Sequence, residues 1–141
     1  TALGAPASGT GLRSVVAADG NSLGISPWNA TFSSEYEFLA WEHGAYFRVD
    51  YNYTAKDTGV TPQRDPRTTT YDPDLLADPA VALLGARLGM RWGEFDLSLY
   101  GRNLLNKTPL LGRGHDGVGD PLYFATTVRP RTIGITGTYR F

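Results

Sequence analysis

The amino-acid sequence predicts an all-β fold: an antiparallel up-and-down meander of about five long strands that is part of a larger transmembrane β-barrel. Three observations lead to this prediction. Five segments alternate between apolar and polar residues, which indicates strands with two different faces. The connections are alternately short and long, as in outer-membrane barrels. The last strand pattern runs to an aromatic carboxy terminus, where a chain normally frays.

Composition narrows the classes of protein and partner. The formal net charge of −1 gives no electrostatic basis for binding nucleic acid. The absence of cysteine excludes disulfides, thiolate metal sites and cysteine nucleophiles. No apolar run reaches the roughly 18 residues of a transmembrane helix. Eight Tyr, six Phe, three Trp and 17 Gly suit strands and turns better than helices.

The first part of the chain contains a predicted loop and a predicted hairpin. Residues 1–27 are rich in Gly, Ala and Ser without sustained periodicity, so they are expected to form a loop segment. Residues 28–38 and 45–55 alternate cleanly and are separated by a short turn over 39–44. Pairing Phe38 with Ala45 brings Glu35 opposite Arg48, a favourable cross-strand pair that supports this register.

The remaining chain contains three more predicted strands and two long loops. Residues 56–79, with four prolines, form the first loop. Strands are predicted over 80–92 and 95–105, and the turn Gly93-Glu94 between them sets Arg91 opposite Asp96. Residues 106–126 form the second loop, and the last strand runs to Phe141. Residues 28–141 are thus expected to be barrel strands, with both long loops at the external end.

The two faces of the predicted strands differ in chemistry. One is aromatic and aliphatic and is expected to contact outer-membrane lipid. The other is expected to line a water-filled lumen and carries Glu35, Arg48, Asp50, Arg87, Arg91, Asp96 and Arg102. Two arrangements are open for Arg87, Arg91 and Arg102. They form either a path for anions or a ladder, that is, a row of arginines each paired with a carboxylate. The cross-strand pairing favours the ladder.

Three segments carry family motifs. Ser98-Leu-Tyr-Gly-Arg-Asn-Leu-Leu-Asn-Lys107 contains an Asn-Leu-(Phe/Leu)-(Asp/Asn)-Lys pattern, and Arg129-Pro-Arg-Thr-Ile-Gly-Ile-Thr-Gly-Thr-Tyr-Arg-Phe141 contains Pro-Arg-Thr followed by Tyr-x-Phe. Pro27-Trp28-Asn-Ala-Thr-Phe, followed by Tyr36, is similar to a strand opening of the Pro-x-aromatic type. In this order and spacing the three segments resemble the closing part of the barrel of TonB-dependent receptors, and the resemblance extends from Gly20 onward.

The resemblance implies a location, a function and partners. The chain would form the last five of 22 strands of a receptor in the bacterial outer membrane that takes up a scarce nutrient, such as a siderophore, cobalamin or a carbohydrate. Its partners would be outer-membrane lipid, the rest of the barrel, the plug domain, and TonB through an amino-terminal part outside these residues. The barrel-assembly machinery would recognise Phe141, together with Tyr139. Unpaired strand edges further predict that the isolated chain self-associates.

The long loops would contribute to nutrient capture, and they hold the candidate ligand contacts Tyr71, Arg113, His115 and Asp116. The alternative to a receptor is a soluble β-barrel or β-sandwich ligand-binding module, in which the apolar face would form an internal core. In that protein the same face would never meet lipid.

No catalytic residue, no cofactor and no metal site is predicted, and the protein is not expected to be an enzyme. Gly112–Gly117 matches G-x-G-x-x-G, but the following Gly119-Asp-Pro121 cannot begin the helix that a dinucleotide-binding fingerprint requires. The aspartates at 72, 74 and 78 lack the glycine and terminal glutamate of a calcium-binding loop. No motif places a serine nucleophile beside a base.

Overall fold

The structure, a computed structural model, describes residues 15–117 and 119–141. In this part of the chain the elements are β1 (Asn29–Ala40), β2 (His43–Thr54), the 3-10 helix η1 (Pro62–Arg64), β3 (Val81–Trp92), β4 (Phe95–Arg102), β5 (Leu111–Gly114), β6 (Phe124–Thr126) and β7 (Thr132–Tyr139). No helix among these residues has the length and apolar character needed to cross a membrane. The loop prediction for residues 1–14 lies outside the described residues.

The chain divides into two compact units. The sheet unit comprises Trp28–Thr54, Ala80–Pro109 and Thr127–Phe141. The loop unit comprises Ala55–Pro79, Leu110–Thr126 and, in its described part, residues 15–27. The two long connections and the amino-terminal segment are therefore packed with one another.

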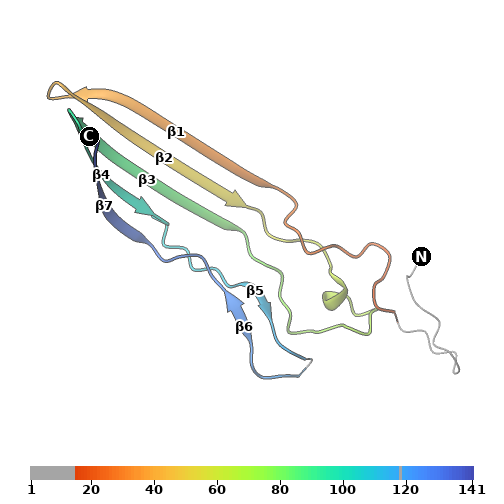
Figure 1. Cartoon of the computed structure of the whole chain (residues 1–141). Helices are drawn as coiled ribbons and strands as arrows, with labels where there is room; N and C mark the ends of the chain where they lie inside the picture. Colours follow the sequence, from red (N-terminus) through yellow and green to blue (C-terminus); the bar gives the residue numbers. More distant parts are fainter. Residues whose placement is uncertain (1–14, 118) are drawn as a thin grey trace, which may run out of the picture. The chain divides into compact units, whose positions relative to one another are not determined.

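Five strands form one antiparallel sheet in the order β1-β2-β3-β4-β7 (Figure 1). Each strand pairs with the strand of this sheet that follows it in the chain, so the topology is an up-and-down meander. The prediction of an all-β fold with an antiparallel meander of five strands is confirmed.

The β1–β2 hairpin has the predicted register. Phe38 pairs with Ala45, and Glu35 pairs with Arg48. The turn is tighter than the expected one over 39–44, because both strands continue to a two-residue connection. Trp41 and Glu42 form it with φ values of 49° and 66°. Positive φ at both turn residues matches the right-handed twist of the flanking strands.

The second half of the sheet follows the prediction except at the end of β4. The turn Gly93-Glu94 sets Arg91 opposite Asp96, as predicted. β4 ends at Arg102 and not at Leu105, because Asn103 has a φ of 49° that turns the backbone out of the sheet. β7 pairs with β4 as far as Tyr139, and the N–H of Arg140 still donates to a carbonyl of the β3–β4 turn at 3.0 Å.

The loop unit contains more regular structure than the sequence indicates. η1 lies in the first long connection, and β5 pairs with β6 in the second. The β5–β6 ribbon is absent from the prediction because it is short and its register is irregular between Leu111 and Gly114. In the amino-terminal segment, residues 15–27 form no strand beyond a single bridge at Ala17, in keeping with the predicted loop.

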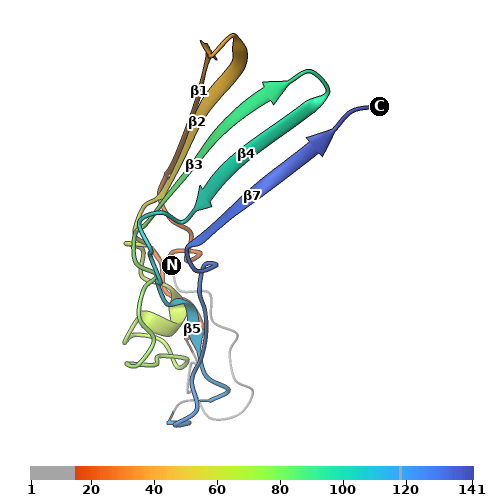
Figure 2. The same cartoon turned by 90° about the vertical axis from the view of Figure 1, so that its left-hand side faces the viewer.

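The sheet unit has almost no buried core. Its buried apolar side chains are Ala45, Tyr46 and Val81, and no large side chain in the described part of the chain is fully buried. Figure 2 shows the sheet as one twisted layer. The apolar face is open, with side chains that are 44–71% exposed: Phe32, Tyr36, Phe47, Leu88, Phe95, Leu97, Leu99, Ile133, Ile135 and Tyr139.

Candidate functional site

Three buried carboxylates organise the loop unit. Asp57, Asp65 and Asp72 are buried, and each forms an ion pair with one basic side chain: Arg64, Arg67 and His115, respectively. A buried charge is stable only when it is paired and hydrogen-bonded. These three pairs therefore give order to a unit that has few buried apolar side chains.

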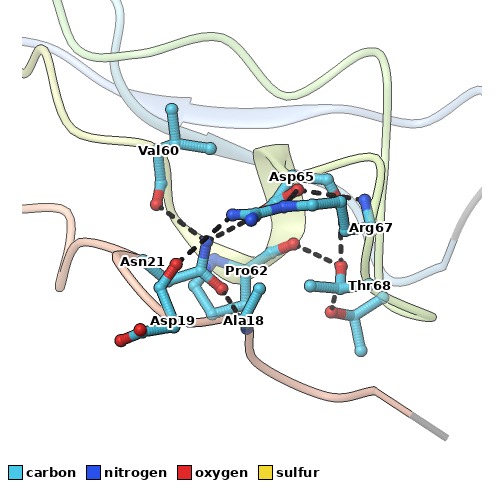
Figure 3. Close-up of polar contacts among 9 residues, drawn as sticks. Ala18, Asp19, Asn21, Val60, Pro62, Asp65, Arg67 and Thr68 are labelled. Atoms are coloured by element: carbon cyan, nitrogen blue, oxygen red, sulfur yellow. Dashed lines mark hydrogen bonds and ion pairs between the residues drawn. The ribbon is translucent and has the colours of Figure 1, made fainter. Parts of the chain in front are cut away.

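Asp65 joins the amino-terminal segment to the first long connection, as Figure 3 shows. Its carboxylate accepts hydrogen bonds from Nε of Arg67 at 2.9 Å, from the backbone N–H of Arg67 at 3.0 Å and from Nδ2 of Asn21 at 2.7 Å. Asn21 in turn accepts the backbone N–H of Ala18 at 2.6 Å. The guanidinium and the backbone N–H of Arg67, with Asn21, hold the pKa of Asp65 well below its usual range.

An ion pair between His115 and Asp72 links the second long connection to the first. The imidazole Nε2 pairs with the Asp72 carboxylate, and Nδ1 lies 3.1 Å from the carbonyl oxygen of Asp120. Both partners are acceptors, so both are satisfied only when the two ring nitrogens carry hydrogens, which is the imidazolium form. In agreement, the hydrogen bond with Asp72 raises the pKa of His115 against the opposing effect of burial.

The carboxylate of this pair is held in its charged form by its hydrogen bonds. Burial alone favours the neutral acid at Asp72. The hydrogen bond from His115 and a second one, from the backbone N–H of Asp74 at 3.0 Å, outweigh burial and lower the pKa of Asp72. The pair is therefore a charged link between the two loops.

Tyr123 brings two predicted candidates together. Its ring stacks on His115 with 4.9 Å between ring centres, and the guanidinium carbon of Arg113 lies 4.4 Å from the centre of the same ring. No sequence pattern indicates Tyr123, because only the pairing of β5 with β6 brings it near the other two. The His115 side chain is 1% exposed and engaged with Asp72, so Arg113 and Tyr123 are the accessible members of this cluster.

Tyr71 and Asp116, the other two predicted ligand contacts, follow or precede members of the His115–Asp72 pair in the chain but take no part in the ion pair or the ring stacking. Both are exposed, and neither side chain makes a hydrogen bond or ion pair within the described residues. Their side chains are free to contact a ligand, and their role stays a prediction.

Two aspartates near the end of the first long connection bind to the second long connection and so stabilise the loop unit. Besides the pairing of Asp72, the carboxylate of Asp78 accepts the backbone N–H of Gly112 in β5 at 2.8 Å. Across residues 15–117 and 119–141, no three His, Asp or Glu side chains are grouped so that they could hold a metal ion.

A second charged region covers the polar face of the sheet. Hydrogen bonds run across β1, β2, β3 and β4, from Ser33 to Asp50 at 2.6 Å and from Tyr46 to Asp96 at 3.1 Å. The Tyr46 ring lies over Gly89, where an added Cβ would come within 2.3 Å of the ring. Glycine at position 89 is therefore required for this packing.

The arginines of the polar face divide into two classes. Arg91 lies 3.0 Å from Glu37 and 3.5 Å from Asp96, as the ladder interpretation predicts. Arg87 and Arg102 form no ion pair with any carboxylate in the described part of the chain. The ladder is therefore confirmed for Arg91 and wrong for the other two.

Asn103 ties the two family-like motif segments together. Its side-chain nitrogen donates to the carbonyl oxygens of Lys107 and Arg129 at 2.8 and 2.9 Å, and its side-chain oxygen accepts the Lys107 N–H at 2.9 Å. The side chain is buried. The first asparagine of the Asn-Leu-Leu-Asn-Lys sequence thus fixes the backbone that precedes Pro130.

The aromatic residues of the predicted assembly signal lie at the end of β7. Tyr139 packs against Phe95 with 4.7 Å between ring centres, and the ring of Phe141 is 6.5 Å from that of Tyr139. Phe141 is fully exposed.

The chain matches no protein-family model, no curated protein and no solved structure.

Proposed function

We propose that this chain is a segment of an outer-membrane β-barrel that belongs to a TonB-dependent receptor and takes part in the uptake of a scarce nutrient. The observation that carries the proposal is the contrast between the two faces of the sheet. The apolar face is open along its length, while the other face is a network of hydrogen bonds and ion pairs.

A bilayer explains this contrast better than water does. Monomeric proteins in water rarely expose contiguous apolar patches larger than a few hundred Å², whereas lipid-facing barrel strands alternate apolar-out and polar-in. β1, β2 and β3 have 12 residues each, and a tilted strand needs about 9–11 residues to cross the hydrocarbon core. These three strands are long enough to cross a bilayer, while β4 and β7, with 8 residues each, are shorter.

The receptor part of the proposal rests on the motif resemblance. The segments around Asn103 and Arg129 that carry the resemblance are held together by one buried side chain, which gives the motif a physical role. The loop unit supports a capture function, because it gathers the long connections into one body with Arg113 and Tyr123 accessible. Uptake in cells should then depend on TonB and on the energy of the inner membrane.

The terminal aromatics support a role in assembly. Among the described residues Phe141 is fully exposed and its ring lies near that of Tyr139, so an assembly factor can reach this ring. We propose that it is read by the barrel-assembly machinery before the strands close.

A cysteine-accessibility experiment tests the membrane location. Because this chain has no native cysteine, labels attach to it only at the introduced positions. Ile135→Cys and its neighbour Thr136→Cys, on opposite faces of β7, are nitroxide-labelled in the full-length protein reconstituted into phosphatidylcholine vesicles. The label at 135 should be reached preferentially by oxygen, and the label at 136 by a water-soluble nickel chelate.

The same labels discriminate the alternative. In a soluble binding module the apolar face is an internal core, so the label at 135 would be inaccessible to both reagents. Equal access of the chelate to both positions would contradict a bilayer location as well.

A further inference from the structure

The polar face of the sheet contains a hollow with an excess of positive charge. Its lining includes four arginines but only two carboxylates: Arg48, Arg87, Arg91 and Arg102, with Glu35 and Asp50. Its floor includes Gly85, and the nearest atoms to a Cβ added there are two backbone oxygens, at 3.4 and 3.9 Å. No side chain covers this part of the floor.

Two of the four arginines form ion pairs with carboxylates of the sheet. Arg48 lies 2.9 Å from Asp50 and 3.8 Å from Glu35. Arg91 is paired with two carboxylates in the same way. The remaining two, Arg87 and Arg102, form no ion pair within the described residues, although Arg87 attracts the carboxylate of Asp50 over a longer distance.

Arg87 and Arg102 gather around one tyrosine. Their guanidinium carbons lie 5.5 and 5.4 Å from the ring centre of Tyr100. That ring lies over Gly134, where an added Cβ would come within 2.6 Å of the phenol oxygen. The only side-chain hydrogen bond of either arginine within the described residues is from Arg87 to Ser98, at 3.0 Å. Most of their N–H donors are therefore unused.

The strand register brings two arginines to opposed positions, and their like charges repel unless an anion lies between them. Arg87 lies directly opposite Arg48 in the β2–β3 pair, and like charges at opposed positions destabilise a sheet. A guanidinium offers a planar set of donors that suits carboxylate and phosphate oxygens. An oxyanion in the hollow would remove the repulsion and use the free donors at once.

We propose that Arg87, Tyr100 and Arg102 form a binding site for a small anionic solute with carboxylate or phosphate groups. The inference deepens the proposed function and rests on it for one point, namely that the polar face lines a water-filled lumen. It assigns an anionic character to a solute that passes or rests at this level of the barrel.

Citrate and inorganic phosphate are the two probes, titrated separately into the chain in dodecyl maltoside, an uncharged detergent without phosphate. Isothermal titration calorimetry gives the affinity, and the Nε–H resonances of the arginines report the site. Arg87→Gln and Arg102→Gln should each weaken binding of the preferred probe about tenfold or more, because each removes charge-assisted hydrogen bonds.

Arg91→Gln is the matched control, because it removes the same charge from the same face at an arginine that already has two carboxylate partners. Its affinity should stay within about twofold of the parent chain, since its donors are already in use. Arg87→Lys and Arg102→Lys, which keep the charge, should bind more tightly than the glutamine variants. Far-UV circular dichroism of every variant verifies that the sheet is retained.

The outcomes separate the two proposals. Stronger binding of citrate identifies the site as a carboxylate site, and stronger binding of phosphate identifies a phosphate site. Binding of neither probe, or equal loss in Arg91→Gln, overturns the anion site and leaves the membrane proposal untouched. Conversely, failure of the nitroxide experiment leaves a positive titration standing, because the titration requires no bilayer.

Discussion

At the scale of single residues, Asn103 shows how one side chain fixes the path of the chain as it leaves the sheet. It makes three side-chain hydrogen bonds from a buried position and adopts a left-handed φ of 49°. Asparagine tolerates this conformation better than most residues because its short polar side chain bonds locally. The same side chain thus stabilises the turn, through Lys107, and binds the backbone at Arg129.

We expect Asn103→Ala to destabilise the folded chain by about 1–3 kcal/mol beyond the loss in a control variant, because it removes three hydrogen bonds made by a buried side chain. The control is Asn106→Ala, since Asn106 has a φ of 52° but an exposed side chain without such bonds. Urea unfolding in detergent measures both variants. Equal destabilisation would mean that backbone strain, and not hydrogen bonding, accounts for the effect.

The His115–Asp72 pair predicts a pH dependence of the loop unit. The pKa of His115 is raised, so its stabilising contribution is complete below its unfolded value of about 6.5 and is lost as the pH rises through the folded value. The pKa of Asp72 is lowered, so its contribution is present above about 3.9 and is lost as the pH falls through the folded value. Both contributions are present together between these limits.

Hydrogen exchange of residues 110–126 at pH 5.5 and pH 8.5, corrected for the intrinsic exchange rates, measures this dependence. We expect weaker protection at the higher pH in the parent chain and no such difference in Asp72→Asn. Asp116→Asn, at an exposed neighbouring carboxylate, should behave like the parent. His115 also faces the Asp120 carbonyl. A pH effect that survives Asp72→Asn would therefore mean that the protonated His115 stabilises the loop unit without its ion pair.

At the scale of elements, β1 offers a direct comparison of the two faces. Phe32 pairs with Tyr51 on the apolar face, and Ser33 pairs with Asp50 on the polar face. An arginine at 32 would face hydrocarbon if the proposed location is right. An arginine at 33 would face water and lie beside the carboxylate of Asp50.

We expect Phe32→Arg to make folding into lipid less favourable by about 2–4 kcal/mol, which is the cost of a charged residue on the lipid face near the bilayer midplane. Ser33→Arg should be tolerated. Urea-dependent folding of the full-length protein into phosphatidylcholine vesicles, followed by tryptophan fluorescence, compares the two. Equal costs, or a larger cost at position 33, would contradict the assignment of the faces.

The elements also show what could be predicted from sequence and what could not. Both hairpin registers follow from local information, because a short turn and one charge pair, Glu35 with Arg48 or Arg91 with Asp96, fix each of them. The loop unit depends on partners far apart in sequence, such as Asp72 and His115. Such pairs leave no periodic pattern in the sequence. The sequence therefore indicates His115 as a candidate contact but shows Asp72 only as one of several aspartates in a loop.

At the scale of the whole molecule, the sheet presents two open edges. Among the described residues β1 and β7 each pair on one side only, so the N–H and C=O groups of their outer edges have no strand partner there. Closing a sheet into even a small barrel takes about eight strands, so these five cannot satisfy their own edges. In water, such edges template pairing with other chains, and the open apolar face adds a hydrophobic driving force.

We therefore expect the isolated 141-residue chain to self-associate in detergent-free buffer. Size exclusion with multi-angle light scattering should give species much larger than the 15.3 kDa monomer, and a mild nonionic detergent should shift them to smaller particles by covering the apolar face. A monodisperse monomer without detergent, with one cooperative unfolding transition, would show that the apolar face is internal. The β1 and β7 edges would then be closed within the chain, and a soluble binding module would account for the sequence better than a barrel segment.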